Sequence, residues 1–217
     1  MLAIAAKRLE IDTIIFCDDA DAPAQNFCTK FIHSNYDDNE SITDFVNQVD
    51  IVTYEFENIP FETLNEINKL RNVLPKPSVN RLIQHRLAEK DFINKLNIRT
   101  TRYVTIKEKS EIEALNDFLP GILKTVTLGY DGKGQHPINS INDLSQLDID
   151  FSKGYILEKL VKLKKEISII ITRFDNLKYE IYEPIENTHQ DQILKYSKIP
   201  AEISEKLFEQ SKNWAIM

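Results

Sequence analysis

Three of the five glycines of this chain lie within six residues, at Gly129, Gly132 and Gly134. Lys124 precedes them and Lys133 stands among them. A short apolar run leads into Lys124 and a further extended run follows the glycines, so we expect a strand, a loop and a second strand. Glycine lets backbone N–H groups approach an anion closely, and lysine adds positive charge. The segment therefore predicts either a cationic loop over a polyphosphate or an ordinary glycine-rich hairpin tip.

Two familiar phosphate-binding motifs do not fit this segment. A Walker A loop and a dinucleotide-binding fingerprint each open a helix, whereas here a strand is expected on both sides of the glycines. Short glycine motifs also arise often without a ligand, so the pattern alone leaves both interpretations open.

Composition limits the classes of protein that remain. The chain has 217 residues, of which 42% are hydrophobic, and this predicts one or two domains with a real core. Its net charge of −7 argues against a general nucleic-acid binder. No apolar run approaches the roughly 20 residues of a membrane span, and the first ten residues lack the pattern of a signal peptide. Two cysteines fit a reducing compartment, so we expect a cytoplasmic protein.

The first third of the chain alternates between helical and β-branched patterns. We expect helices at 1–9, 41–49 and 59–70, and strands at 13–17, 30–33 and 50–54. This order predicts an α/β fold in which helices cover both faces of a parallel sheet. Because a doubly wound domain normally begins with a strand and a glycine turn, a chain that opens on a helix suggests a truncated domain or a smaller sheet.

A proline-rich break at 75–78 predicts a linker, and the rest of the chain reads as a second, α+β domain. The helices expected there span 79–96, 109–118, 141–147 and 201–217. The expected strands span 101–105, 121–125, 135–138, 155–157, 167–171 and 178–182, and the strongest of them is the β-branched run 167–171.

The segment GYDGKGQ, which starts five residues after Lys124, resembles the phosphate-covering loop of the ATP-grasp ligases. Within that superfamily it more narrowly resembles the N5-carboxyaminoimidazole ribonucleotide synthases. Four further segments carry this resemblance: TYEFENIP (53–60), HRLAEKDF (85–92), EKLV (158–161) and ENTHQDQILKYS (186–197). The family pattern has an aspartate where this chain has His85. The resemblance runs through the whole chain but covers only about the first three fifths of such an enzyme.

The resemblance implies a partial pre-ATP-grasp domain at 1–74, without its first strand and glycine turn, and an incomplete ATP-grasp domain at 79–217. It also implies the residues that bind ATP: Arg86, Lys124, Gly129, Tyr130, Asp131, Gly132, Lys133, Gly134, Gln135, Glu158, Lys159, Leu160, Val161, Glu166 and His189. In this scheme Arg86 contacts phosphates, Glu158 and the backbone after it read adenine, Glu166 binds the ribose and His189 borders the nucleotide.

Glu55 is the one residue that the resemblance assigns to the second substrate. It lies beyond the expected strand 50–54, where open parallel sheets bind ligands, and relatives use a glutamate there for ribose hydroxyls. The alternative is a solvated glutamate at the end of a strand.

The resemblance implies an ATP-dependent carbon–nitrogen ligase of purine biosynthesis. Such an enzyme converts bicarbonate into carboxyphosphate, and the amine of aminoimidazole ribonucleotide captures the carbon dioxide. The implied cofactors are ATP and Mg²⁺, and the intact family implies a homodimer. The metal carboxylates of the family lie beyond the equivalent of Met217, so we assign no metal ligand and no catalytic residue.

Two other hypotheses stay open, a nucleotide-binding remnant without catalysis and another carboxylating or formyl-transferring ATP-grasp ligase. A second polypeptide could complete the metal site, and without one we expect the chain to bind ATP weakly and not to turn it over.

Overall fold

The computed structural model describes residues 1–129, 134–174, 178–191 and 193–217. The chain divides into two compact units, Met1–His85 and Arg86–Met217, which are described separately. The helices of the described residues include none that is long and apolar enough to cross a membrane.

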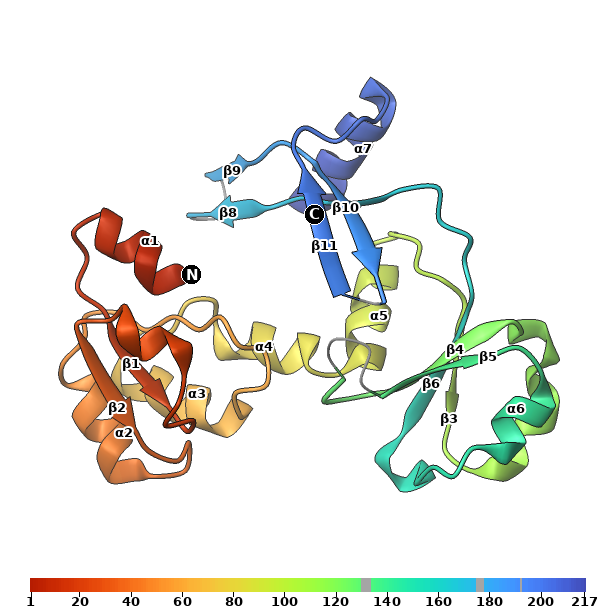
Figure 1. The fold of residues 1–217 in the computed structure, drawn as a ribbon, viewed down its shortest axis with the longest axis horizontal. Helices are drawn as coiled ribbons and strands as arrows, with labels where there is room; N and C mark the ends of the chain where they lie inside the picture. The colour runs from red at the N-terminus through yellow and green to blue at the C-terminus, as the bar shows by residue number, and fades with distance from the viewer. Residues whose placement is uncertain (130–133, 175–177, 192) are drawn as a thin grey trace. The chain divides into compact units, whose positions relative to one another are not determined.

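The first unit builds a small parallel sheet with helices around it (Figure 1). Its elements in chain order are α1 (Leu2–Arg8), β1 (Ile14–Cys17), the 3-10 helix η1 (Pro23–Asn26), β2 (Lys30–His33), α2 (Asn39–Val46), α3 (Phe61–Leu70) and α4 (Pro77–Ile83). β1 and β2 pair in parallel from Ile14 opposite Lys30 to Cys17 opposite His33. Apolar side chains of α2 and α3 pack with Val52 and Val73 to form the core of this unit.

The prediction of a third strand at 50–54 is wrong. Val52 instead makes one isolated parallel bridge with Val73. Its N–H donates to Asn72 O at 2.9 Å, and its carbonyl accepts from Leu74 N–H at 2.9 Å. The β-branched pattern is genuine and Val52 is buried, but the pairing ends after one residue on each chain segment.

Asp38 caps α2, which begins at Asn39, two residues before the helix expected at 41–49. Its carboxylate accepts the backbone N–H groups of Glu40 and Ser41 and the hydroxyls of Ser34 and Ser41. A side chain that accepts the free N–H groups of the first turn is the usual way in which a helix starts.

The second unit opens with a helix and a four-stranded antiparallel sheet of order β3-β6-β4-β5. Its elements here are α5 (Arg86–Lys95), β3 (Tyr103–Ile106), η2 (Lys109–Phe118), β4 (Gly121–Thr125), β5 (Gln135–Ile138), α6 (Ile141–Gln146), η3 (Phe151–Lys153) and β6 (Tyr155–Lys159). The expected helix at 109–118 is therefore a 3-10 helix. A core joins one face of the sheet to η2 and α6, with Ile106, Leu123, Leu144 and Leu157 fully buried.

The remainder of the second unit contains two further sheets and a final helix. Its elements are β7 (Glu166–Ser168), β8 (Ile171–Arg173), β9 (Tyr179–Ile181), β10 (Ile185–Gln190), β11 (Ile193–Lys198) and α7 (Glu205–Ile216). β8 pairs with β9, whereas β10 lies between β7 and β11. Every residue of β11 is exposed, and no described residue of α7 is buried.

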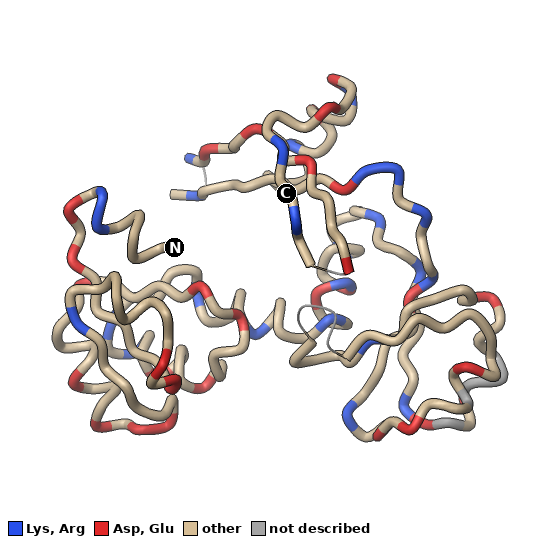
Figure 2. The backbone as a smooth tube through the Cα atoms, viewed as in Figure 1, with Lys and Arg blue, Asp and Glu red and all other residues tan. Residues whose placement is uncertain are grey.

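The continuous strand predicted at 167–171 is wrong, because its residues change partner in the middle. Ile167 pairs with Glu186 in one sheet, and Ile171 pairs with Ile181 in the other. Before β7, the segment 160–165 carries Lys162, Lys164 and Lys165, which Figure 2 shows as a group of blue positions.

The single helix predicted at 79–96 is also wrong, because it is interrupted between α4 and α5. The Arg86 N–H donates to Val126 O at 2.9 Å in place of a helical carbonyl one turn back. Ser78 belongs to α4 and not to an extended linker. The boundary between the two compact units follows His85, which is later in the sequence than the expected linker at 75–78.

Candidate nucleotide site

The antiparallel pairing of β4 with β6 brings two predicted site residues to one face of the sheet. Ile122 stands opposite Glu158 and Lys124 stands opposite Ile156, so Lys124 and Glu158 are diagonal neighbours. Successive side chains of a strand alternate between faces, and Leu123 and Leu157 occupy the hydrophobic core. Lys124 and Glu158 therefore lie on the opposite face from that core.

Glu158 binds two lysines at once. One carboxylate oxygen lies 2.8 Å from Lys124 Nζ and the other lies 3.0 Å from Lys90 Nζ. The side chain of Glu158 is only 10% exposed, and those of Lys90 and Lys124 are 15% and 18% exposed. Burial by itself would raise the pKa of Glu158, but the hydrogen bonds and charges of Lys124 and Lys90 bring that pKa below its ordinary value. The carboxylate is therefore charged at neutral pH, and we call these three residues the lysine–glutamate triad.

Lys90 is not among the site residues that the sequence predicts. It lies in α5, one turn after Arg86, and its ammonium also stands 5.5 Å from the centre of the Tyr103 ring. Its position in HRLAEKDF, on the same helix face as Arg86, was the one available signal. A basic residue on a helix is usually solvated, and only the three-dimensional fold shows that this one meets Glu158.

Arg86 holds the start of the glycine loop. Its Nε donates to Thr125 O at 3.0 Å and its Nη2 donates to Gly129 O at 2.8 Å, in addition to the backbone bond to Val126. These donors therefore bind loop carbonyls in this structure, and the predicted contact of Arg86 with phosphate stays a prediction.

The two ends of the glycine loop meet on the sheet. The Thr125 N–H donates to Gly134 O at 3.0 Å, and Lys124 pairs with Gln135 across β4 and β5. Gly134 has a φ of +69°, and a Cβ atom there would lie 2.7 Å from Thr125 Oγ1. The backbone conformation and the closeness of Thr125 therefore favour glycine at position 134. The predicted loop residues Tyr130, Asp131, Gly132 and Lys133 lie outside the described residues.

The predicted adenine-binding segment 158–161 comprises the last two residues of β6 and the two residues after it. The Leu160 N–H donates to Pro120 O at 2.9 Å, Lys159 Nζ donates to Leu119 O, and the side chains of Leu160 and Val161 are half-exposed. Each oxygen of the Glu158 carboxylate contacts one lysine, and the role of Glu158 and the backbone after it in reading adenine stays a prediction.

Glu166 and His189, which the resemblance places around the nucleotide, do lie together. His189 Nδ1 is 3.3 Å from Glu166 Oε1, on the paired strands β7 and β10. His189 belongs to β10, beside an irregularity in the pairing with β11. Glu55, by contrast, is exposed and belongs to the first unit.

Among the residues that the structure describes, no group of three or more histidine, cysteine, aspartate or glutamate side chains is placed to hold a metal ion. The expectation that Mg²⁺ accompanies ATP stays a prediction.

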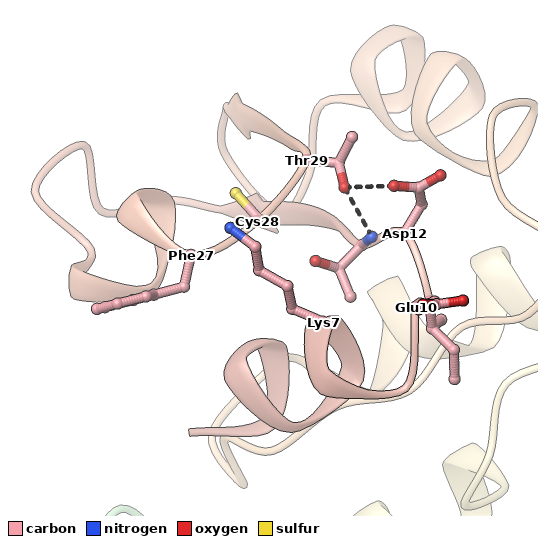
Figure 3. A pocket seen from close by; sticks show the side chains of 8 residues that line it. Lys7, Glu10, Asp12, Phe27, Cys28 and Thr29 are labelled. Atoms are coloured by element: carbon pink, nitrogen blue, oxygen red, sulfur yellow. Dashed lines mark hydrogen bonds between the residues drawn. The ribbon is translucent and has the colours of Figure 1, made fainter.

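The first unit contains a small hollow of about 330 Å³ (Figure 3). In its wall Thr29 Oγ1 donates to Asp12 Oδ1 at 2.9 Å and accepts the Thr13 N–H at 3.2 Å. The hollow is lined by Lys7, Glu10, Ile11, Asp12, Thr13, Phe27, Cys28 and Thr29. None of the predicted site residues lines it.

An antiparallel sheet that brings Lys124 and Glu158 together beside a glycine loop agrees with the ATP-grasp class of nucleotide-binding proteins that the sequence resembles. The chain belongs to the ATP-grasp family: residues 91–216 match the model of the ATP-grasp domain. Residues 1–84 match the model of the ribonucleotide synthetase preATP-grasp domain.

The similar proteins narrow the class further. The chain is 34% identical over 209 residues to the N5-carboxyaminoimidazole ribonucleotide synthase of Brucella melitensis, covering 94% of this chain and 58% of that protein. It is 35% identical to the bifunctional purine synthesis protein purC/E of Dictyostelium discoideum, covering 97% of this chain and 22% of that protein. A solved N5-carboxyaminoimidazole synthetase from Staphylococcus aureus, complexed with ADP, superimposes with a TM-score of 0.88 at 30% identity, covering 100% of this chain and 59% of that one.

The chain thus spans less than two thirds of the length of these relatives. The similarity confirms the predicted family and fold class. The activity of a complete enzyme is a separate question.

Proposed function

We propose that this chain forms the nucleotide-binding part of a ligase that uses ATP to carboxylate 5-aminoimidazole ribonucleotide with bicarbonate in purine biosynthesis. The observation that carries the proposal is the lysine–glutamate triad beside the glycine loop, on the sheet of a domain that matches the ATP-grasp model. The ADP bound in the similar synthetase supports a nucleotide as the ligand.

In this proposal Lys124 contacts the phosphates, and the loop held by Arg86 covers them. Glycine-rich loops present backbone N–H groups to phosphate oxygens, and ammonium groups form strong charge-assisted hydrogen bonds with them. Magnesium would neutralise further phosphate charge when it is bound. The carbonyls and N–H groups of 159–161 would hold the adenine, while Glu166 and His189 would lie against the sugar.

Glu55 would contact the ribonucleotide. It is exposed, in keeping with a group that meets a ligand, and it follows the paired residue Val52 in the unit that matches the preATP-grasp model. In the proposal, groups other than these complete the reaction site, and a homodimer or a second polypeptide would be one way to supply them.

The alternative is a protein that binds a nucleotide without catalysis, because the chain covers 58% of the Brucella enzyme. To separate the two, ATP affinity is measured by calorimetry, and phosphate release is followed with ATP, magnesium, bicarbonate and aminoimidazole ribonucleotide. Phosphate release that depends on the ribonucleotide supports the ligase. ATP binding without phosphate release and without any binding of the ribonucleotide supports the alternative, and absence of ATP binding contradicts both.

A further inference from the structure

The lysine–glutamate triad has an imbalance of charge. It places two ammonium groups against one carboxylate, and each side chain of the triad is less than a fifth exposed. Because Glu158 is ionised, the triad carries a net charge of +1 in a poorly solvated place. An unbalanced charge in such a place is costly until an anion approaches it.

Two described neighbours of Lys90, Tyr103 and Asp91, do not remove this imbalance. The Tyr103 ring faces the Lys90 ammonium and attracts it through the electrons of its face without supplying a charge. Asp91, the next residue of α5, accepts a hydrogen bond from the Tyr103 hydroxyl instead. The hydroxyl of Tyr103 also accepts from Asn94 Nδ2 at 3.1 Å, so this small network fixes the ring on which Lys90 rests.

We propose that Lys90 is a positioning residue for polyphosphate binding: by engaging one oxygen of Glu158 it leaves Lys124 with charge for the ligand. With Lys90 present, the carboxylate is shared between two cations. Without it, Glu158 and Lys124 form a neutral pair whose attraction for phosphate is weak. The inference rests on the proposed function, since it assumes that Lys124 meets phosphate groups, but it assigns to Lys90 a role that the resemblance does not.

This role makes a prediction that differs from that of a purely structural one. If Lys90 served only the fold, Lys90→Met would lower the melting temperature of the free protein and leave the stabilisation by ligand unchanged. If it maintains the charge of the triad, Lys90→Met leaves the free protein as stable as before, because the remaining pair is neutral. The rise in melting temperature that a polyphosphate causes then becomes smaller.

The experiment compares the 217-residue chain with its Lys90→Met, Lys90→Arg and Lys69→Met variants. The probes are ATP, inorganic tripolyphosphate and adenosine. Lys69 is a matched control with the same change of charge, because it pairs with Glu66 on α3 and its side chain is 60% exposed. We expect Lys90→Met to lower the affinity for ATP and for tripolyphosphate about tenfold, which is the effect of one charge-assisted contact. The affinity for adenosine should stay as in the parent chain.

Lys90→Arg should recover most of the affinity for both polyphosphates, since it keeps the cation beside Glu158. Equal affinities of the parent and Lys90→Met chains for tripolyphosphate would overturn the inference. Equal losses in Lys90→Met and Lys69→Met would also overturn it, because the effect would then be one of overall charge. If the parent chain binds tripolyphosphate through Lys90 but does not bind ATP, the proposed function is contradicted, whereas the inferred role of Lys90 in polyphosphate binding is supported.

Discussion

Lys124 is the residue on which nucleotide affinity should depend most directly. It lies near the end of β4 beside the glycine loop, whereas Lys164 is exposed in the segment between β6 and β7. We expect Lys124→Ala to weaken ATP binding by about 10- to 100-fold, the value of a hydrogen bond between charged groups, and Lys164→Ala to change it little. Calorimetry of the two variants measures this, and equal affinities would remove the reason for placing the phosphates here.

Gly134 should be intolerant of any side chain. Its φ of +69° disfavours L-residues, and a Cβ atom would press against Thr125. Gly134→Ala should therefore lower stability by about 1–2 kcal/mol and also weaken ATP binding, since it distorts the end of the loop. Urea unfolding and calorimetry together check this.

Gly154→Ala is the matched control for Gly134→Ala. Gly154 has nearly the same φ, +71°, and lies outside the glycine loop. It should lose a similar amount of stability and keep its ATP affinity. A loss of affinity in both variants would show that backbone strain alone, and not the loop, explains the effect.

At this scale the sequence revealed individual residues but not their partners. Lys124 and Glu158 could be predicted because they lie in segments that resemble a family. The contact of Lys90 with Glu158 spans 68 positions of sequence and depends on how α5 meets the sheet, as the numbers of the two residues show. The hydrogen bonds that Arg86 donates to Thr125 and Gly129 are accepted by backbone carbonyl oxygens. Every residue has such an oxygen, so no side-chain pattern in the sequence could predict these bonds.

Among the elements, α2 offers a test of how a helix begins. Hydrogen bonds from Ser34 and Ser41, with those from the backbone N–H groups of the first turn, lower the pKa of Asp38 from 3.8 to about 2. A carboxylate with a lowered pKa in the folded state stabilises the protein fully above pH 3.8, and this stabilisation is lost as the pH falls toward 2.

Asp38→Ala should accordingly lower the melting temperature by about 2–4 °C at pH 7, as expected for a lost helix cap in a chain of this size. The difference from the parent chain should shrink as the pH approaches 2. Asp38→Asn is the control, because asparagine still accepts N–H groups but does not ionise. A difference for Asp38→Ala that is independent of pH would show that the charge of Asp38 contributes nothing.

The elements show where a local pattern is sufficient. β2, β4 and β5 begin and end at the residues that the sequence predicts, because short strands flanked by turn residues have few alternatives. The sequence predicts a single strand for 167–171, but the two ends of this run pair in two different sheets. No local sequence pattern marks the change of partner between Ser168 and Ile171. The break before Arg86 has the same origin, since a distant carbonyl, Val126 O, replaces a helical one.

For the whole molecule, the division into two compact units predicts that unfolding is not a single transition. Trp214, the one tryptophan of the chain, lies on α7 in the second unit. Its fluorescence therefore follows the second unit, while far-ultraviolet circular dichroism follows both. We expect the two signals to give different midpoints in urea, and ATP to raise the fluorescence midpoint in particular. Coincident midpoints with and without ATP would mean that the units unfold together.

Burial differs between the strands of the second unit, and this difference predicts the order in which their amide protons exchange with deuterium. Four of the five residues of β6 are buried, whereas all six of β11 are exposed. Amides protected only by the β10–β11 pairing can exchange through opening of that hairpin alone, at a small cost in free energy, while those of β6 wait for a much larger opening. Mass spectrometry should find deuterium in 193–198 within seconds and in 155–159 only after hours. The backbone hydrogen bonds of β11 would thus open orders of magnitude more often than those of β6, although both belong to regular antiparallel sheets.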